Sequence, residues 1–211
     1  MLALEAWAVR NKMEINAKKT KEMWISFWKS HELQALEPIR IRNSEIERVK
    51  VFKLLGVHVQ SDLKWITHIH EIVARVSKQL HFLGVSLSRK TNLPTEVGLT
   101  TYITKIRPLM EYALPIWGGI PNYLAKDIQR IQDRSMDLLG LARETLEPLS
   151  VKRDKQTGKA FKDILESADH PCTRFIKEVL HSYSFRSQRV RVPVPCTNRC
   201  RESFIQRGVQ M

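Results

Sequence analysis

The acidic side chains of this 211-residue sequence stand singly rather than in clusters. Catalysis by paired divalent metals uses clustered carboxylates to hold the ions that stabilise the attacking and leaving oxygens of phosphoryl transfer. No two aspartates are adjacent here. We interpret Asp62 as a helix cap, and Asp133 and Asp137 as parts of a solvated helix face. The carboxylates therefore argue against metal-dependent phosphoryl transfer by this chain alone.

Histidines and cysteines form two further groups of possible metal ligands. His68 and His70 are two residues apart, and on a helix such residues point to different faces. The other group has a spacing closer to that of zinc sites, and consists of His170, Cys172, Cys196 and Cys200. Its internal gap is long, and its last two cysteines are not in the tight spacing of zinc knuckles. We predict no cofactor, and leave open whether these cysteines bind a metal.

Two short segments stand out by their local chemistry. The polar turn at residues 16–21 holds Lys18, Lys19 and Lys21 and so places three flexible ammonium groups close together. The same lysines fit an ordinary solvated turn. Further on, Leu54-Leu55-Gly56 interrupts an apolar strand. Glycine has no Cβ, so this break indicates either a close approach by another backbone or a β-bulge.

The balance of charge is strongly basic. The 35 Lys and Arg residues exceed the 22 Asp and Glu residues by 13, and the pI is near 9.9. Such an excess is typical of a surface that meets phosphates or anionic lipid, and a generically basic soluble protein is the alternative. No stretch is apolar enough to span a membrane, and three cysteines confined to the tail favour a reducing compartment. We expect an intracellular protein of the cytoplasm or nucleus that does not enter a membrane.

The elements that would position these residues change character near Ser61. Before it, the patterns predict a helix at residues 2–12 and strands at residues 23–27, 38–41 and 49–59, which we expect to form a small antiparallel sheet. After it, a helical stripe runs through Trp65, Ile69, Ile72, Val73, Val76, Leu80 and Leu83.

Further helices are predicted beyond Asn92. One runs from Pro94 through Ile106, and prolines and glycines interrupt the chain between Pro108 and Gly119. The next has an inward set consisting of Leu124, Ile128, Ile131, Met136 and Leu139. The fold class is therefore α+β: a short antiparallel sheet followed by a mainly helical region.

Three blocks, in their order and spacing, resemble the region after the catalytic aspartates in reverse transcriptases of non-LTR retrotransposons, of the jockey or CR1 type. The blocks are residues 7–23, residues 49–65 with the run Phe52-Lys53-Leu54-Leu55-Gly56-Val57, and residues 102–117. The sequence starts after the position of those aspartates. The resemblance thus implies a truncated polymerase that is inactive as this chain, with Mg²⁺ belonging only to the complete polymerase.

The resemblance also assigns roles to residues. Lys19 corresponds best to the motif D lysine near the phosphates of the incoming nucleotide, with Lys21 as the fallback. Leu54, Leu55 and Gly56 correspond to the primer grip. The thumb of this family holds a duplex, so its helices should carry basic residues. The candidates for nucleic-acid binding are Arg75, Lys78, Arg89, Lys90, Lys105 and Arg107.

The resemblance implies three parts of the chain and one class of partner. Residues 1–60 are the end of the palm, residues 61–147 a thumb-like region, and residues 148–211 a basic, partly disordered segment. The expected partner is RNA or an RNA–DNA duplex, bound through its backbone without sequence readout. The oligomeric state stays open. The alternative is a non-functional gene remnant, or a helical protein-interaction module whose basic face is incidental.

Overall fold

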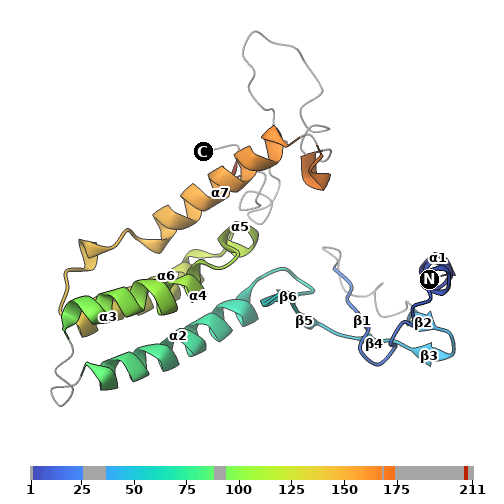
Figure 1. Ribbon diagram of the computed structural model, residues 1–211, viewed down its shortest axis with the longest axis horizontal. Coiled ribbons are helices and arrows are strands. Elements are labelled where there is room, and N and C mark those ends of the chain that lie inside the picture. Colours follow the sequence, from blue (N-terminus) through green and yellow to red (C-terminus); the bar gives the residue numbers. More distant parts are fainter. Residues whose placement is uncertain (1, 26–36, 88–93, 168, 174–206, 209–211) are drawn as a thin grey trace, which may run out of the picture. The chain divides into compact units, whose positions relative to one another are not determined.

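The computed structural model describes residues 2–25, 37–87, 94–167, 169–173 and 207–208 (Figure 1). The chain forms two compact units, Met1–His68 and Ile69–Met211. Helices predominate, and the strands occur in short pairs. This confirms the predicted α+β class. The division at residues 60 and 147 stays a prediction.

The described residues of the first unit form one complete helix and three two-stranded ladders. The helix is α1 (Leu2–Arg10). The ladders are β1 (Lys21–Glu22) parallel to β4 (Glu47–Arg48), β2 (Arg40–Ile41) antiparallel to β3 (Ser44–Glu45), and β5 (Val51–Leu54) antiparallel to β6 (Val57–Gln60). The prediction of one small antiparallel sheet is wrong for the described residues, because the ladders are separate and one is parallel.

A buried carboxylate, that of Glu22, forms hydrogen bonds with several segments of the first unit. Glu22 is 6% exposed and accepts hydrogen bonds from the Arg48 guanidinium at 2.9 Å, from the Ile39 N–H at 3.2 Å and from the Trp24 indole. The Trp24 hydrogen bond is the main cause of a lowered Glu22 pKa, and it outweighs the opposing effect of burial. Of the predicted strand at residues 23–27, residues 23–25 are not in a strand, because β1 ends at Glu22, and residues 26 and 27 lie outside the described residues.

The hydrophobic core of the first unit is small. Its buried apolar residues among those described are Ala8, Ile41, Ile46 and Val57. On α1 the apolar residues Trp7 and Val9 are exposed, as is Met13 just after the helix. The described part of this unit therefore leaves much apolar surface in contact with solvent.

The second unit is helical. α2 (Ile66–Ser86) begins in the first unit and continues into the second. The other elements are α3 (Thr95–Thr101), a π-helix (Tyr102–Ile106), α4 (Arg107–Glu111), α5 (Leu114–Trp117), α6 (Asn122–Leu139), a 3₁₀ turn (Arg143–Thr145) and α7 (Leu149–Glu166). In the described ranges, no helix combines the length and apolar character of a membrane span.

The core of the second unit follows the predicted helical stripes. On α2 the buried members are Ile69, Ile72, Val76, Leu80 and Leu83, whereas Val73 is half-buried. Trp65, also half-buried, lies just before the helix. On α6 the whole predicted inward set is buried: Leu124, Ile128, Ile131, Met136 and Leu139. These stripes were predicted correctly because a 3.6-residue period brings every third or fourth residue to one face.

The chain stays helical through Pro108, where the sequence predicted a break. Proline has no N–H to donate to the carbonyl of Thr104, and its ring would clash with that carbonyl in a regular α-helix. The π-helix at residues 102–106 widens the turn just before this position. Such a widening accommodates an interrupted ladder, so the helix continues to Glu111. The break comes instead at Ala113, whose φ is 56°.

Candidate nucleic-acid interface

The predicted primer-grip residues form the tip of a β-hairpin. Leu54 pairs with Val57, so Leu55 and Gly56 make up a two-residue turn. Their φ angles are 47° and 86°, and two positive values in this position define a type I′ turn. The Leu54 side chain is 55% exposed and that of Leu55 is 84% exposed. The predicted single strand at residues 49–59 is thus two strands, and the break is a tight turn rather than a bulge.

The hairpin is hydrogen-bonded to the first turn of α2. The Thr67 N–H donates to the Gln60 side-chain oxygen at 2.8 Å, so Gln60 caps the helix. Asp62, which the sequence predicted as the cap, instead accepts from the Lys64 N–H at 3.1 Å. The His58 N–H lies 3.4 Å from Nδ1 of His68. Burial, and secondarily the nearby His58, lower the pKa of His68 to about 4, so His68 is neutral near pH 7.

The two candidate motif D lysines have different surroundings. Lys19 lies on a turn in which its N–H donates to the Asn16 side chain at 3.1 Å, and its own side chain is exposed. Lys21 forms an ion pair with Glu47 across the β1–β4 ladder. Lys19 is therefore the more accessible of the two cations for a phosphate.

Three predicted binding residues are exposed on two neighbouring elements of the second unit. Arg75 and Lys78 lie on α2, and Lys105 lies on the π-helix. Between α2 and the α3–π segment is a groove of about 340 Å³, which we call the Lys105 groove. Its rim includes Lys105, Thr101 and Val97 on one side, and Gln79, Phe82 and Ser86 on the other. Arg89 and Lys90 lie outside the described residues.

The structure gives Arg107 a different role from the one predicted. Its side chain is buried, with Nε 2.6 Å from the Glu111 carboxylate and Nη2 3.0 Å from the Glu147 carbonyl oxygen. Lys152 extends this network to α7, with Nζ 4.0 Å from Glu111. Arg107 therefore connects α4 to the segment before α7, and we do not include it in the binding surface.

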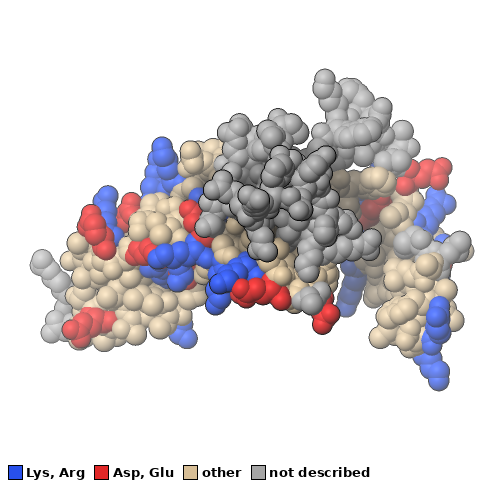
Figure 2. Space-filling view, turned by 90° about the horizontal axis from the view of Figure 1, so that it is seen from above, with Lys and Arg blue, Asp and Glu red and all other residues tan. Residues whose placement is uncertain are grey.

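Sequence reasoning missed a second group of cations, on α6. Lys126, Arg130 and Arg134 are exposed and recur every four residues, so they share one face of the helix. Arg130 is paired with Asp127 at 2.9 Å. The four-residue spacing of these cations could have identified them in the sequence. The aspartates between them instead led us to interpret the helix surface as an ordinary solvated face. Figure 2 likewise shows Lys and Arg interspersed with Asp and Glu on the face in view.

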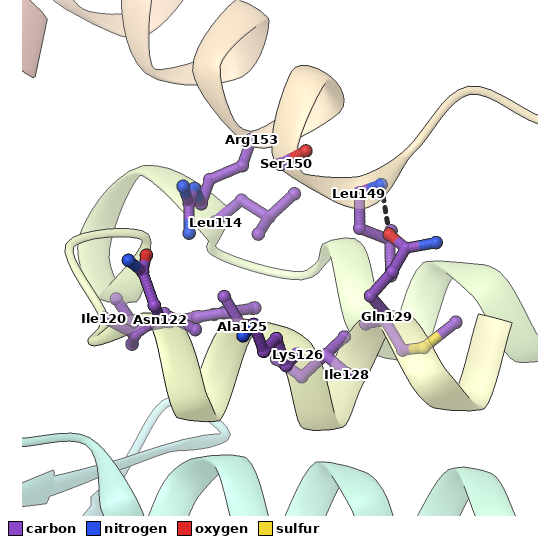
Figure 3. Close-up of a pocket in the computed structure, with 12 residues that line it drawn as sticks. Leu114, Ile120, Asn122, Ala125, Lys126, Ile128, Gln129, Leu149, Ser150 and Arg153 are labelled. Carbon is purple, nitrogen blue, oxygen red and sulfur yellow. Dashed lines mark hydrogen bonds between the residues drawn. The ribbon is translucent and has the colours of Figure 1, made fainter. Parts of the chain in front are cut away.

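A mostly apolar pocket of about 230 Å³ lies where α6 meets α7 (Figure 3). Gln129 of α6 reaches across to α7, and its side-chain oxygen accepts a hydrogen bond from the Leu149 N–H at 3.2 Å. Leu114 and Ile128 contribute apolar surface, and Arg153 of α7 contributes a cation. The contact fixes the first turn of α7 on α6, whose inward residues were predicted correctly.

No cluster of three His, Cys, Asp or Glu side chains that could hold a metal occurs in the described part of the chain. Cys172 is an exposed free thiol, and its N–H donates to Nδ1 of His170 at 3.1 Å. Cys196 and Cys200 lie outside the described residues, so the question of a metal bound by the three cysteines stays open.

One curated protein resembles this chain over about two thirds of the chain's length. The chain is 23% identical over 136 residues to a protein of Drosophila melanogaster described as "Probable RNA-directed DNA polymerase from transposon BS". The match covers 64% of this chain and 15% of that protein. No protein-family model matches the chain, and no solved structure matches it significantly. The distant similarity supports a relationship to reverse transcriptases.

Proposed function

We propose that this chain corresponds to the end of the palm, the primer grip and the thumb of a non-LTR retrotransposon reverse transcriptase of the jockey or CR1 type. Its proposed activity is the binding of RNA or an RNA–DNA duplex through the sugar–phosphate backbone, without sequence readout. The proposed setting is intracellular, in the cytoplasm or nucleus.

The observation that carries this proposal is the hairpin tip at Leu54, Leu55 and Gly56. A type I′ turn with exposed apolar side chains presents its backbone to solvent, as the resemblance requires of a primer grip. Gly56 lacks a Cβ, so a sugar–phosphate chain can approach closely there. A capped helix follows the hairpin, in the order expected of a thumb. The similarity to a transposon polymerase adds support from outside the structure.

Binding would rest on the exposed cations. Arg75, Lys78 and Lys105 can each neutralise a phosphate and release a condensed counterion, and the exposed α6 cations can add further phosphate contacts. Lys19 would stand near the phosphates of an incoming nucleotide. We derive no metal-dependent step, because the described carboxylates do not form a site for Mg²⁺.

Salt dependence tests the binding proposal. If about four to six phosphates are neutralised, the slope of log K against log salt should be about −3 to −5 for an RNA–DNA duplex. Replacing Arg75, Lys78 and Lys105 with alanine should make this slope shallower and weaken binding to all sequences alike. A matched control removes three other exposed cations of the second unit, Arg143, Lys159 and Lys162. Equal losses in both triple variants would favour the incidental basic face of an interaction module.

Polymerisation gives a separate test. The 211 residues contain no adjacent aspartates, so primer extension by this chain alone is expected to be absent with Mg²⁺ or Mn²⁺. Adding a polypeptide that contains the upstream palm should restore it if this chain is a polymerase part. Incorporation that is lost when an aspartate of this chain is mutated would contradict the proposal.

A further inference from the structure

We propose that the Lys105 groove holds one unpaired nucleobase of an RNA strand, stacked on the ring of Phe82. This inference rests on the proposed function and makes it more specific. Backbone contacts hold any duplex, whereas the groove would favour RNA with a single-stranded portion beside the duplex.

Phe82 has the position that a stacking platform needs. Its side chain is 54% exposed on α2 and forms one wall of the groove. The neighbouring His81 ring lies 6.1 Å away at an angle of 58°, so it is tilted rather than stacked on the phenyl ring. Single-strand-binding proteins use such exposed aromatic rings because every base has a π-face.

The size of the groove indicates what it accepts. Its volume of about 340 Å³ is near the lower end of the range for sites that take small ligands. It is large enough for a single planar base, and a base can insert beside Phe82 only when it is not held within a duplex. The proposed occupant is therefore an unpaired base, as in an overhang, a loop or a bulge.

Polar and charged groups surround the aromatic wall. Lys105 lies on the opposite side of the groove and can contact a phosphate of the strand whose base is inserted. Arg75 precedes Phe82 by seven residues, or two helical turns, so it lies on nearly the same face of α2. Between them, Gln79 lines the groove with an amide that can both donate and accept hydrogen bonds. This amide can form hydrogen bonds with the edge of any base, so little sequence preference is expected.

The test compares three labelled nucleic acids under one salt condition. They are a blunt RNA–DNA duplex, the same duplex with a single-stranded RNA overhang, and the duplex with an abasic overhang. The abasic strand keeps the phosphates and removes the bases, so it separates stacking from charge. The wild-type chain should bind the natural overhang about tenfold more tightly than the other two.

Four variants make the test specific. Phe82→Ala should remove the advantage of the natural overhang and leave blunt-duplex binding unchanged, whereas Phe82→Trp should keep that advantage. Val85→Ala is the matched control, because Val85 is 58% exposed on the same helix. Lys105→Ala should weaken binding to all three nucleic acids. A 2-aminopurine in the overhang should be quenched by the wild type and not by Phe82→Ala.

The outcomes separate this inference from the function on which it rests. Duplex binding without any advantage for the natural overhang, or an advantage that Phe82→Ala retains, would overturn the inference and leave duplex binding standing. Failure to bind any of the three nucleic acids would overturn both.

Discussion

Lys105 and Arg107 are two residues apart, and the fold gives them opposite surroundings. Both are basic residues on one continuous helical run, so sequence alone placed them in the same candidate set. Lys105 is exposed at a groove, whereas Arg107 is buried between Glu111 and the Glu147 carbonyl. A buried arginine with satisfied partners contributes to the structure, and removing it would leave Glu111 with the more distant Lys152, at 4.0 Å, in place of its close partner. Burial, which periodicity predicts poorly across a π-helix, decides the role of each residue.

The turn residue Leu55 provides a first prediction. A non-glycine residue with φ of 47° costs about 1 kcal/mol, and asparagine tolerates this conformation better than leucine. Leu55→Asn should therefore stabilise the hairpin by about 0.5–1 kcal/mol. If the exposed leucine contacts a primer, the same change should weaken duplex binding. Amide exchange in residues 51–60 and duplex affinity measure the two effects.

Gly56→Ala is the matched control for this experiment. At a φ of 86° any Cβ is strained, so the hairpin should lose about 1 kcal/mol. A more stable Leu55→Asn hairpin that binds duplex as the wild type does would show that the leucine side chain has no part in binding.

The buried His68 should make the first unit less stable in acid. Burial lowers its pKa to about 4 from an ordinary value of 6.5, so the neutral form is favoured in the folded state. The free energy of unfolding should be highest above pH 6.5 and should decrease as the pH falls from 6.5 towards 4. In that range the unfolded chain binds a proton at this histidine, whereas the folded chain does not. The loss should reach about 3 kcal/mol at most. Urea unfolding between pH 7 and 4 measures it.

Two substitutions identify the responsible histidine. His68→Gln should remove most of this acid sensitivity from the first unit. His70→Gln should leave it intact, because His70 is two residues further along the same helix and is exposed on a different face. Equal pH dependence in the wild type and His68→Gln would show that another group is responsible.

At the scale of elements, helices were more predictable than strands. The stripe of α6 depends on residues three and four apart, and all five of its predicted inward residues are buried. The strands of the first unit depend on partners far along the chain, such as Glu47 opposite Lys21. A pattern of alternating residues indicates which face of a strand is buried, but it does not identify the distant strand with which it pairs. Residues 49–59 looked like one strand because the apolar run continues on both sides of the Leu55–Gly56 turn.

The candidate site was predictable in part. Arg75, Lys78 and Lys105 were identified from charge and from their places on successive helices. Phe82 was not, because a single aromatic beside the apolar stripe of a helix resembles a core residue until its 54% exposure is known. The groove itself depends on how α3 and the π-helix pack beside α2, and no local pattern contains that information.

Close helix packing at Gly98 gives an element-scale prediction. A Cβ at this position would lie 2.7 Å from Leu139 of α6 and 3.0 Å from Leu87. Gly98→Ala should therefore destabilise the second unit by about 1–3 kcal/mol through overpacking, despite alanine's better helix propensity. Gly84→Ala is the control, because its Cβ would be 3.2 Å from the partly exposed Leu138, which can move. Urea unfolding compares the two.

A double variant checks that the clash is the cause. In a Leu139→Ala background the space for a new methyl group exists, so Gly98→Ala should cost much less there. Purely additive effects of the two substitutions would rule out the proposed clash between α3 and α6.

At the scale of the whole molecule, the two units have very different cores. The described part of the first unit buries four apolar residues and holds three ladders of two to four residues a strand. Two-stranded ladders of this kind are marginally stable without further covering. The second unit buries long stripes on α2 and α6 together with Tyr102, Met110, Leu114 and Trp117. Stability should therefore be concentrated after residue 68.

Hydrogen exchange can measure this difference directly. Amides of residues 69–86 and 122–139 should be strongly protected, because they belong to helices that bury a full apolar face. Amides of β1 to β6 should exchange faster, with the β5–β6 hairpin slowest among them because it has the longest ladder and is bonded to α2.

Binding of an RNA–DNA duplex should slow exchange at residues 51–60 if their turn is a primer grip. Equal protection of both units without ligand would show that the first unit has a self-sufficient core. Protection of the hairpin that does not change on duplex binding would place the nucleic acid on the helices of the second unit instead.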